Sequence, residues 1–379
     1  MISKKSFKLL CVGNSFSDNA LKYAYQILNS FGVQNIVVAN LYIGGCTLET
    51  HKKNIIEGLP AYEYKKNSTG VFDIRYNTTL DYGLMDEEWD FITMQQSSGS
   101  SGMIETYDVS FINKYLYTNA KSKNVKIGWN MTWAYPKDSK HDEFVKYHNN
   151  QDEMYQQIVK CVEKVIKPDK NFAFLAPLGT AIQNARTSYI GDTLTPDGFH
   201  LESLGEFIAG TMLIEAITKW NLDDMNLNLI PQQFISYIDI VKESVNNALK
   251  KPFNVTKSKI VKEKIENECS VEVIKDIEYG FENYKLDLYL PTCELNETLI
   301  QFHGGGLVSG SKDDDGLIDL AINLSKNGKA IIVVDYPLLN DHSIKQIIEA
   351  SKQSIEFVKE YFKKNSIKSK LVFSGQSAG

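Results

Sequence analysis

The first 250 residues alternate short apolar runs with longer amphipathic segments. The apolar runs predict strands, and apolar residues at helical spacing predict helices between them. The expected strands are 7–12, 35–41, 89–94, 125–129 and 171–176, and the expected helices are 20–31, 104–122, 151–166, 205–220 and 231–249. Strands separated by helices predict an α/β fold whose parallel sheet is covered by helices on both faces.

The pattern changes after about residue 250, where Lys, Asn, Glu and Val replace the apolar periodicity. This change predicts a first domain at 1–250, a linker at 251–268 and a second domain at 269–379. A length of 379 residues agrees with two domains, because one hydrophobic core seldom serves so long a chain. In the second domain we expect a hairpin of 271–279 and 284–290, strands 298–302, 330–334 and 370–373, and helices 316–327 and 343–364.

Composition narrows the classes of function. Hydrophobic residues make up 43% of the chain and charged residues 23%, as in ordinary globular proteins. The net charge of −6 disfavours nucleic acid as a partner, and no 18-residue apolar window predicts a membrane span. The apolar stretch near the N-terminus is too short for a signal peptide, so we expect a cytoplasmic protein. No pair of cysteines shows CxxC spacing, so no zinc site is predicted.

The first candidate for chemistry is Ser15 in Gly13-Asn14-Ser15, directly after the first expected strand. A serine in this position stands at the edge of the sheet where α/β proteins bind ligands, and its hydroxyl can act as a nucleophile. The same segment also fits an ordinary helix cap, because Ser and Asn are favoured there.

The second candidate is the pair Asp197 and His200, which lie three residues apart before the expected helix 205–220. The carboxylate can orient the imidazole, whose other nitrogen can then accept a proton from a serine. A turn with a solvated Asp and an incidental His is the alternative. Gly45 after the second strand and Gln95–Gln96 after the third supply backbone and carboxamide donors for a developing oxyanion.

These blocks, in this order, resemble the SGNH (GDSL-like) hydrolase superfamily from Phe7 to about Trp220. Gly13-Asn14-Ser15 resembles the nucleophile block, Gly44–Gly45 the glycine block and Asp197–His200 the last block. Residues 41–48, 129–135 and 179–188 look like a branch whose third block carries Gln. The superfamily normally has Asn in that block, so Gln95–Gln96 is a departure, and we prefer Gln95 slightly as the oxyanion donor.

The resemblance implies a serine ester hydrolase. Ser15 would attack the ester carbonyl, His200 would act as general base and Asp197 would orient it, with the N–H groups of Ser15 and Gly45 and a Gln side chain holding the oxyanion. No metal or other cofactor is needed. The analogy favours a carbohydrate O-acetylesterase acting on a small-molecule or oligosaccharide ester. A lipase, lysophospholipase or thioesterase on the same triad is the alternative, as is a non-catalytic carbohydrate-binding module.

Four residues are weaker candidates for substrate binding. Trp133 and Tyr135 follow a strand end and fit an aromatic platform for a sugar ring, but core packing is the more common role of aromatics. Asn184 and Arg186 follow the fifth strand and fit contacts with a sugar hydroxyl or a carboxylate, although a structural role is more common. Arg186 is one of only two arginines in the chain.

The second domain carries its own pair of motifs. His303-Gly304-Gly305-Gly306 is an oxyanion-loop pattern, and Gly375-Gln376-Ser377-Ala378-Gly379 fits a nucleophile elbow. Both follow expected strands, and together they resemble an esterase of the α/β-hydrolase fold. In that fold the acid and the histidine follow the serine, yet the sequence stops at Gly379. We therefore expect a truncated α/β-hydrolase half-domain in which Ser377, Gly304 and Gly305 form no working site.

Overall fold

A computed structural model of the chain describes residues 5–260, 270–295, 297–377 and 379. The chain forms two compact units, Met1–Lys262 and Glu263–Gly379. No helix among the described residues is long and apolar enough to cross a membrane. The predicted linker 251–268 differs in part from the structure. The Thr256 and Ser258 N–H groups donate to side chains at the end of helix α7 (Leu178–Arg186), so the segment before 261 packs on the first unit, while 261–268 lie outside the described residues.

Within residues 5–260, a seven-stranded sheet has the order β4-β3-β2-β1-β5-β6-β7. The strands are β1 (Ser6–Gly13), β2 (Asn35–Tyr42), β3 (Tyr62–Asn67), β4 (Phe72–Thr78), β5 (Phe91–Met94), β6 (Lys126–Asn130) and β7 (Phe174–Ala176). β2, β1, β5, β6 and β7 run parallel, whereas β3 and β4 form an antiparallel hairpin at one edge. β1 is buried between β2 and β5, which explains its nearly continuous apolar sequence.

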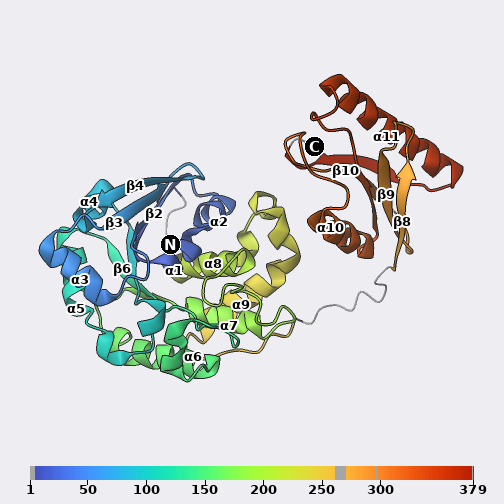
Figure 1. The fold of residues 1–379 in the computed structure, drawn as a ribbon. Helices are drawn as coiled ribbons and strands as arrows, with labels where there is room; N and C mark the ends of the chain where they lie inside the picture. The colour runs from blue at the N-terminus through green and yellow to red at the C-terminus, as the bar shows by residue number, and fades with distance from the viewer. Residues whose placement is uncertain (1–4, 261–269, 296, 378) are drawn as a thin grey trace. The chain divides into compact units, whose positions relative to one another are not determined.

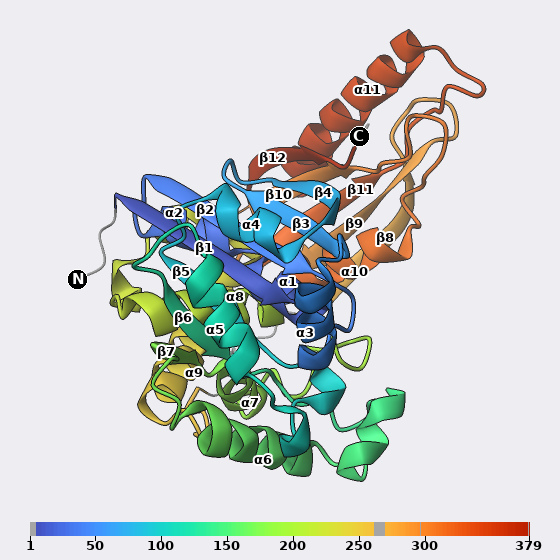
Figure 2. The same cartoon turned by 90° about the vertical axis from the view of Figure 1, so that its left-hand side faces the viewer.

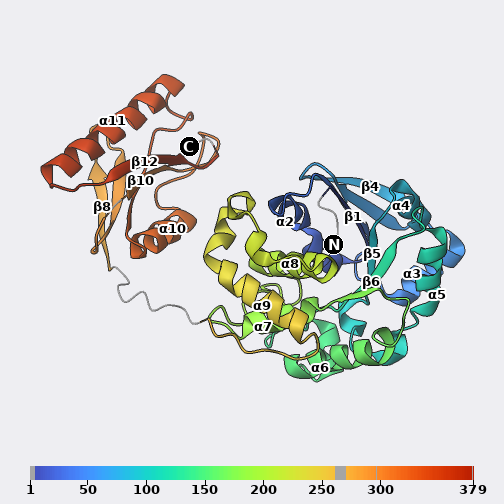
Figure 3. The same cartoon turned by 180° about the vertical axis from the view of Figure 1, so that it is seen from behind.

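Helices cover both faces of this sheet, as predicted. They are α1 (Ser15–Leu21), α2 (Ala24–Ser30), α3 (Leu48–Glu57), α4 (Leu80–Asp86), α5 (Ser110–Asn119), α6 (Gln151–Cys161), α7, α8 (Leu204–Thr218) and α9 (Ile238–Lys250). Figure 1 shows α3, α4 and α5 on one side of the sheet and α1, α2 and α8 on the other. Figure 2 is turned toward the first group, and Figure 3 shows α8 and α9 from behind.

Three features of this unit differ from the expectations. The helix expected at 20–31 is divided between α1 and α2, and the β3–β4 hairpin and helices α3, α4 and α7 were not predicted. β4 is almost fully exposed and β3 carries charged residues, so neither has the apolar run that predicts a buried strand. α7 is buried over its whole length, so it lacks the polar face that marks a surface helix.

The second unit is a five-stranded sheet, in the order β12-β10-β11-β9-β8, within the residues described after 269. It comprises β8 (Val271–Glu278), β9 (Lys285–Pro291), β10 (Glu297–Phe302), β11 (Lys329–Val334) and β12 (Lys370–Gly375), with α10 (Asp315–Lys326) and α11 (Ile344–Lys364). β8 and β9 form the predicted hairpin. Alternate residues of β11 face opposite sides: Ile332 packs in the cluster that contains α11, and Ile331 in the cluster that contains α10.

Helix α8 is buried on nearly all sides and carries one acidic side chain into the interior. Glu215 is 2% exposed, and its Oε1 has no hydrogen-bond partner among the described residues. Burial raises the pKa of Glu215 from 4.5 to about 7, although Lys219 and Thr218 oppose the shift. A carboxyl with a raised pKa favours folding while it is protonated, so its contribution is complete below about pH 4.5 and is lost as the pH rises through 7.

We therefore expect Glu215→Gln to relieve a loss of stability at alkaline pH. A pKa change of this size corresponds to about 3 kcal/mol of unfolding free energy. The gain of the variant over wild type should be larger at pH 8 than at pH 5, measured by thermal unfolding of the full chain. Glu57→Gln, at an exposed position, is the matched control. An equal gain at both pH values would contradict the raised pKa.

Candidate active site

Ser15 is the first residue of α1, and Asn14 alone separates it from the end of β1. The capping role belongs to its neighbour Asn14, whose side chain accepts a hydrogen bond of 3.0 Å from the Phe16 N–H. The Ser15 hydroxyl is therefore not used for capping. Because β2 and β5 lie on opposite sides of β1, Ser15 stands where the strand order reverses, which is the point at which open α/β sheets bind ligands.

Ser15, His200 and Asp197 form a continuous chain of hydrogen bonds. Ser15 Oγ lies 2.7 Å from His200 Nε2, and His200 Nδ1 lies 2.7 Å from Asp197 Oδ2. With the proton on Nδ1, the imidazole donates to the carboxylate and Nε2 accepts from the serine hydroxyl. This is the arrangement in which an imidazole acts as general base toward a serine hydroxyl.

The Asp197 carboxylate is itself held by the backbone of the same loop. Its Oδ1 accepts hydrogen bonds from the N–H groups of Phe199, at 3.0 Å, and His200, at 2.8 Å. Partial burial alone would raise the pKa of Asp197, but these two N–H groups and the imidazole together lower it. Gly198 has a φ of +96°, a backbone conformation that favours glycine and lets the loop close this tightly. Asp197 is thus fixed as the charged partner of His200.

Trp133 joins the two segments that carry the site. Its ring stacks on Phe16 with centroids 4.0 Å apart, and its Nε1–H donates to the Phe199 carbonyl at 2.9 Å. The Phe199 ring in turn lies 3.9 Å from the His200 ring. The indole therefore packs against α1 and holds the histidine loop with one hydrogen bond, which explains why Trp133 is fully buried.

Asn19, four residues after Ser15 on α1, makes a second link to the histidine loop. Its Oδ1 accepts from the Leu201 N–H at 3.1 Å, and its Nδ2 donates to the Leu201 carbonyl at 3.0 Å. The two bonds fix the residue after His200 relative to the helix that begins with Ser15. The motifs in the sequence do not reveal Asn19; the one signal is its position a single helical turn after the nucleophile.

The loop after β2 brings Gly45 toward Ser15. Asn14 Nδ2 donates to the Cys46 carbonyl at 3.2 Å, and the Ile43 N–H donates to the Gly13 carbonyl at 3.2 Å. Gly45 is exposed with a φ of +63°. Within residues 5–260, neither the Gly45 nor the Ser15 N–H has a hydrogen-bond partner. Both backbone donors are therefore open to an oxyanion.

The two glutamines have different surroundings. Gln96 Nε2 donates to Thr106 O at 3.1 Å and Oγ1 at 3.0 Å, while its Oε1 accepts from the N–H groups of Leu48 and Ser97. These bonds commit both of its amide hydrogens. Gln95 Nε2 instead donates to Asn14 Oδ1 at 2.9 Å, directly beside the nucleophile, and retains a second hydrogen. Gln95 thus stays the oxyanion candidate, although its side chain is fully buried.

The structure places the four weaker substrate candidates in the interior rather than in a binding surface. Trp133 and Tyr135 are both 0% exposed, so neither offers a ring face to a sugar. The Tyr135 hydroxyl hydrogen-bonds Ser98 Oγ at 2.8 Å. The sequence does not distinguish a platform from a core aromatic, because burial depends on packing by segments far away in the chain.

Asn184 and Arg186 likewise have structural partners. Asn184 Nδ2 donates to the Ser244 carbonyl at 3.1 Å, and Oδ1 accepts from the Thr256 N–H at 2.6 Å. Arg186 Nε lies 2.7 Å from Asp192 Oδ1, and its Nη2 donates to Thr195 Oγ1 at 3.2 Å. Burial lowers the pKa of Arg186 to about 10, although Asp192 opposes the shift. Arg186 thus contacts the loop that precedes Asp197.

The second unit brings its motifs together without a triad among the described residues. Ser377 follows β12 with a φ of +57°, and it lines a cavity of about 380 Å³ with Gly304 and Gly305. Within the described residues, no histidine hydrogen-bonds to the Ser377 hydroxyl. His303 stacks on Tyr336 at 4.2 Å instead. The expectation that Ser377 is inactive stays a prediction.

Family comparisons fit this division of the chain. Residues 8–263 match the family described as a domain of unknown function, DUF4886. The chain belongs to the DUF4886 family. A crystal structure of a DUF4886 family protein from Bacteroides uniformis is 33% identical, with a TM-score of 0.63; the match covers 67% of this chain and 98% of that one. Residues 286–379, in the second unit, match the BD-FAE family. No curated protein matches the chain.

Two further solved structures are similar to parts of the chain. A candidate SGNH hydrolase from Slackia heliotrinireducens is 19% identical over 56% of this chain and all of that one, with a TM-score of 0.39. Esterase B from Lactobacillus rhamnosis is 24% identical over 29% of this chain, with a TM-score of 0.25, and the match covers 36% of that protein.

The link between Asn19 and Leu201 predicts a positioning effect in the DUF4886 unit. We expect Asn19→Ala to lower kcat for a small ester such as p-nitrophenyl acetate by about tenfold, with a smaller change in KM, because slight misplacement of reacting groups is costly. Asn29→Ala, exposed on α2, is the control and should leave kcat unchanged. Equal kcat for wild type and Asn19→Ala would contradict a positioning role.

Proposed function

We propose that the first unit is a serine ester hydrolase that acts through an acyl-enzyme on Ser15, and that its substrate is an O-acetylated carbohydrate. The observation that carries the ester hydrolase is the chain from Ser15 through His200 to Asp197, with both distances at 2.7 Å. Spare backbone donors on Ser15 and Gly45 support acyl transfer, because a triad needs a partner for the negative oxygen.

The proposed reaction has two halves. His200 Nε2 takes the Ser15 proton as Oγ attacks the carbonyl carbon, and Asp197 stabilises the imidazolium. The Ser15 and Gly45 N–H groups, with Gln95, hold the tetrahedral oxyanion. When the intermediate collapses, His200 returns the proton to the leaving alcohol. Water then attacks the acyl-enzyme with His200 again as base, which releases the acid and regenerates Ser15.

A lipase, lysophospholipase or thioesterase would use the same triad, and a carbohydrate-binding module would use none of it. Hydrolysis of p-nitrophenyl acetate separates the enzyme from the binding module. We expect Ser15→Ala to lower the rate by about 10³-fold or more, since the nucleophile is lost. Ser68→Ala, at an exposed position, is the control. Acetate should also be cleaved faster than butyrate or octanoate. Equal rates for wild type and Ser15→Ala would contradict the proposed hydrolase. A preference for the octanoate ester would favour an enzyme that acts on acyl chains.

A further inference from the structure

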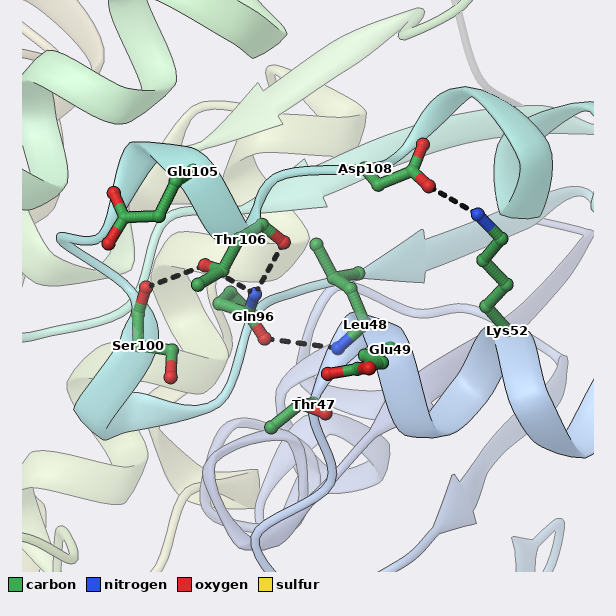
Figure 4. Close-up of a pocket in the computed structure, with 9 residues that line it drawn as sticks. All are labelled: Thr47, Leu48, Glu49, Lys52, Gln96, Ser100, Glu105, Thr106 and Asp108. Carbon is green, nitrogen blue, oxygen red and sulfur yellow. Dashed lines mark hydrogen bonds and ion pairs between the residues drawn. The ribbon is translucent and has the colours of Figure 1, made fainter.

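A cavity lies beside the loop that carries Gly45, and most of the residues that line it are polar or charged. It has a volume of about 410 Å³, within the usual range for small-molecule pockets. Two loops and the start of α3 form its walls, and Leu48 is the one apolar residue in the lining (Figure 4). The lining residues are Thr47, Leu48, Glu49, Lys52, Gln96, Ser100, Glu105, Thr106 and Asp108.

Two residues of the cavity lining are sequence neighbours of residues that contact Asn14. Thr47 directly follows Cys46, whose carbonyl accepts from Asn14 Nδ2 at 3.2 Å. Gln96 directly follows Gln95, whose Nε2 donates to Asn14 Oδ1 at 2.9 Å. Asn14 precedes Ser15. The cavity therefore lies beside the two segments that contact the residue before Ser15.

Hydrogen bonds keep the inner wall of the cavity in place. Gln96 lies between the start of α3 and the segment after β5, bonded to the Leu48 N–H at 3.1 Å and to Thr106 Oγ1 at 3.0 Å (Figure 4). Gln96 is 1% exposed, and its amide hydrogens are committed to Thr106. The cavity is thus preformed, which lowers the ordering cost of binding a ligand.

The charges in the lining define the chemistry of the ligand. Lys52 Nζ lies 2.5 Å from Asp108 Oδ2, so the one lysine is already paired. Glu49 and Glu105 are exposed, and neither has a hydrogen-bond or ion-pair partner within residues 5–260. Two unpaired carboxylates accept hydrogen bonds from hydroxyl groups and repel an anion.

We propose that this cavity is a substrate subsite that binds the hydroxyl groups of an uncharged sugar and excludes sugars that carry a carboxylate. This inference rests on the proposed ester hydrolase at Ser15 and names its substrate class. Glu49 and Glu105 accept hydrogen bonds from the sugar, and their charges set the discrimination against anions.

A pair of matched substrates tests the subsite. A mono-O-acetylated methyl glucoside and the corresponding methyl glucuronide differ in one carboxylate. The full chain should hydrolyse the glucoside with a kcat/KM at least about tenfold higher than that for the glucuronide. The carboxylates of Glu49 and Glu105 repel the carboxylate of the glucuronide and so oppose its binding. The double variant Glu49→Gln, Glu105→Gln should reduce that ratio several-fold. The variant Glu57→Gln, Glu88→Gln, which removes equal charge at exposed positions outside the cavity, should leave the ratio unchanged.

The outcomes separate this proposal from the one on which it rests. If p-nitrophenyl acetate is hydrolysed equally by wild type and Ser15→Ala, the hydrolase itself is wrong. If that hydrolysis depends on Ser15 but neither sugar ester is cleaved, the subsite is wrong and the hydrolase stands. The subsite is also overturned if wild type cleaves the two sugar esters equally, or if the cavity variant and the control variant give the same ratio.

Discussion

The hydrogen bond between Ser15 Oγ and His200 Nε2 is the interaction on which the proposed chemistry depends. It joins residues 185 positions apart in the sequence at 2.7 Å, so it forms only when α1 and the histidine loop are held together. The sheet sets the position of Ser15 at the end of β1, where the strand order reverses. Trp133 and Asn19 then hold the loop of His200 against α1. The Ser15 hydroxyl is available for the bond to His200 because the neighbouring Asn14 side chain caps the helix instead.

The sequence predicted the parts of the fold whose patterns are local. β1 and β2 lie at the expected residues, because buried strands carry nearly unbroken apolar runs. The β8–β9 hairpin also lies close to its expected residues. The β3–β4 hairpin was missed because an edge hairpin with an exposed face needs no such run. α7 was missed for the opposite reason, since a fully buried helix shows no polar face. Whether the β3–β4 hairpin and α7 are exposed or buried depends on the segments packed around them, which their own sequences do not reveal.

In the candidate site, too, the residues in local sequence blocks could be predicted and those defined by distant contacts could not. Ser15, Asp197 and His200 could be proposed because each lies in a short block next to a strand or helix end, and the order of the blocks resembles a known superfamily. Trp133 and Arg186 were named as candidate substrate contacts, but both side chains lie in the interior, bonded to the carbonyl groups of Phe199 and Ala134, which are distant in sequence. Asn19 was not predicted, since its role exists only in contact with Leu201.

Labelling with a fluorophosphonate, which reacts covalently with activated serine hydroxyls, tests the central claim most directly. After digestion of the labelled full chain, mass spectrometry of the peptides should locate the adduct on Ser15. The adduct should be lost in His200→Ala, because the hydroxyl then has no base. An unlabelled Ser15 in the folded wild-type chain, or equal labelling with and without His200, would contradict the account.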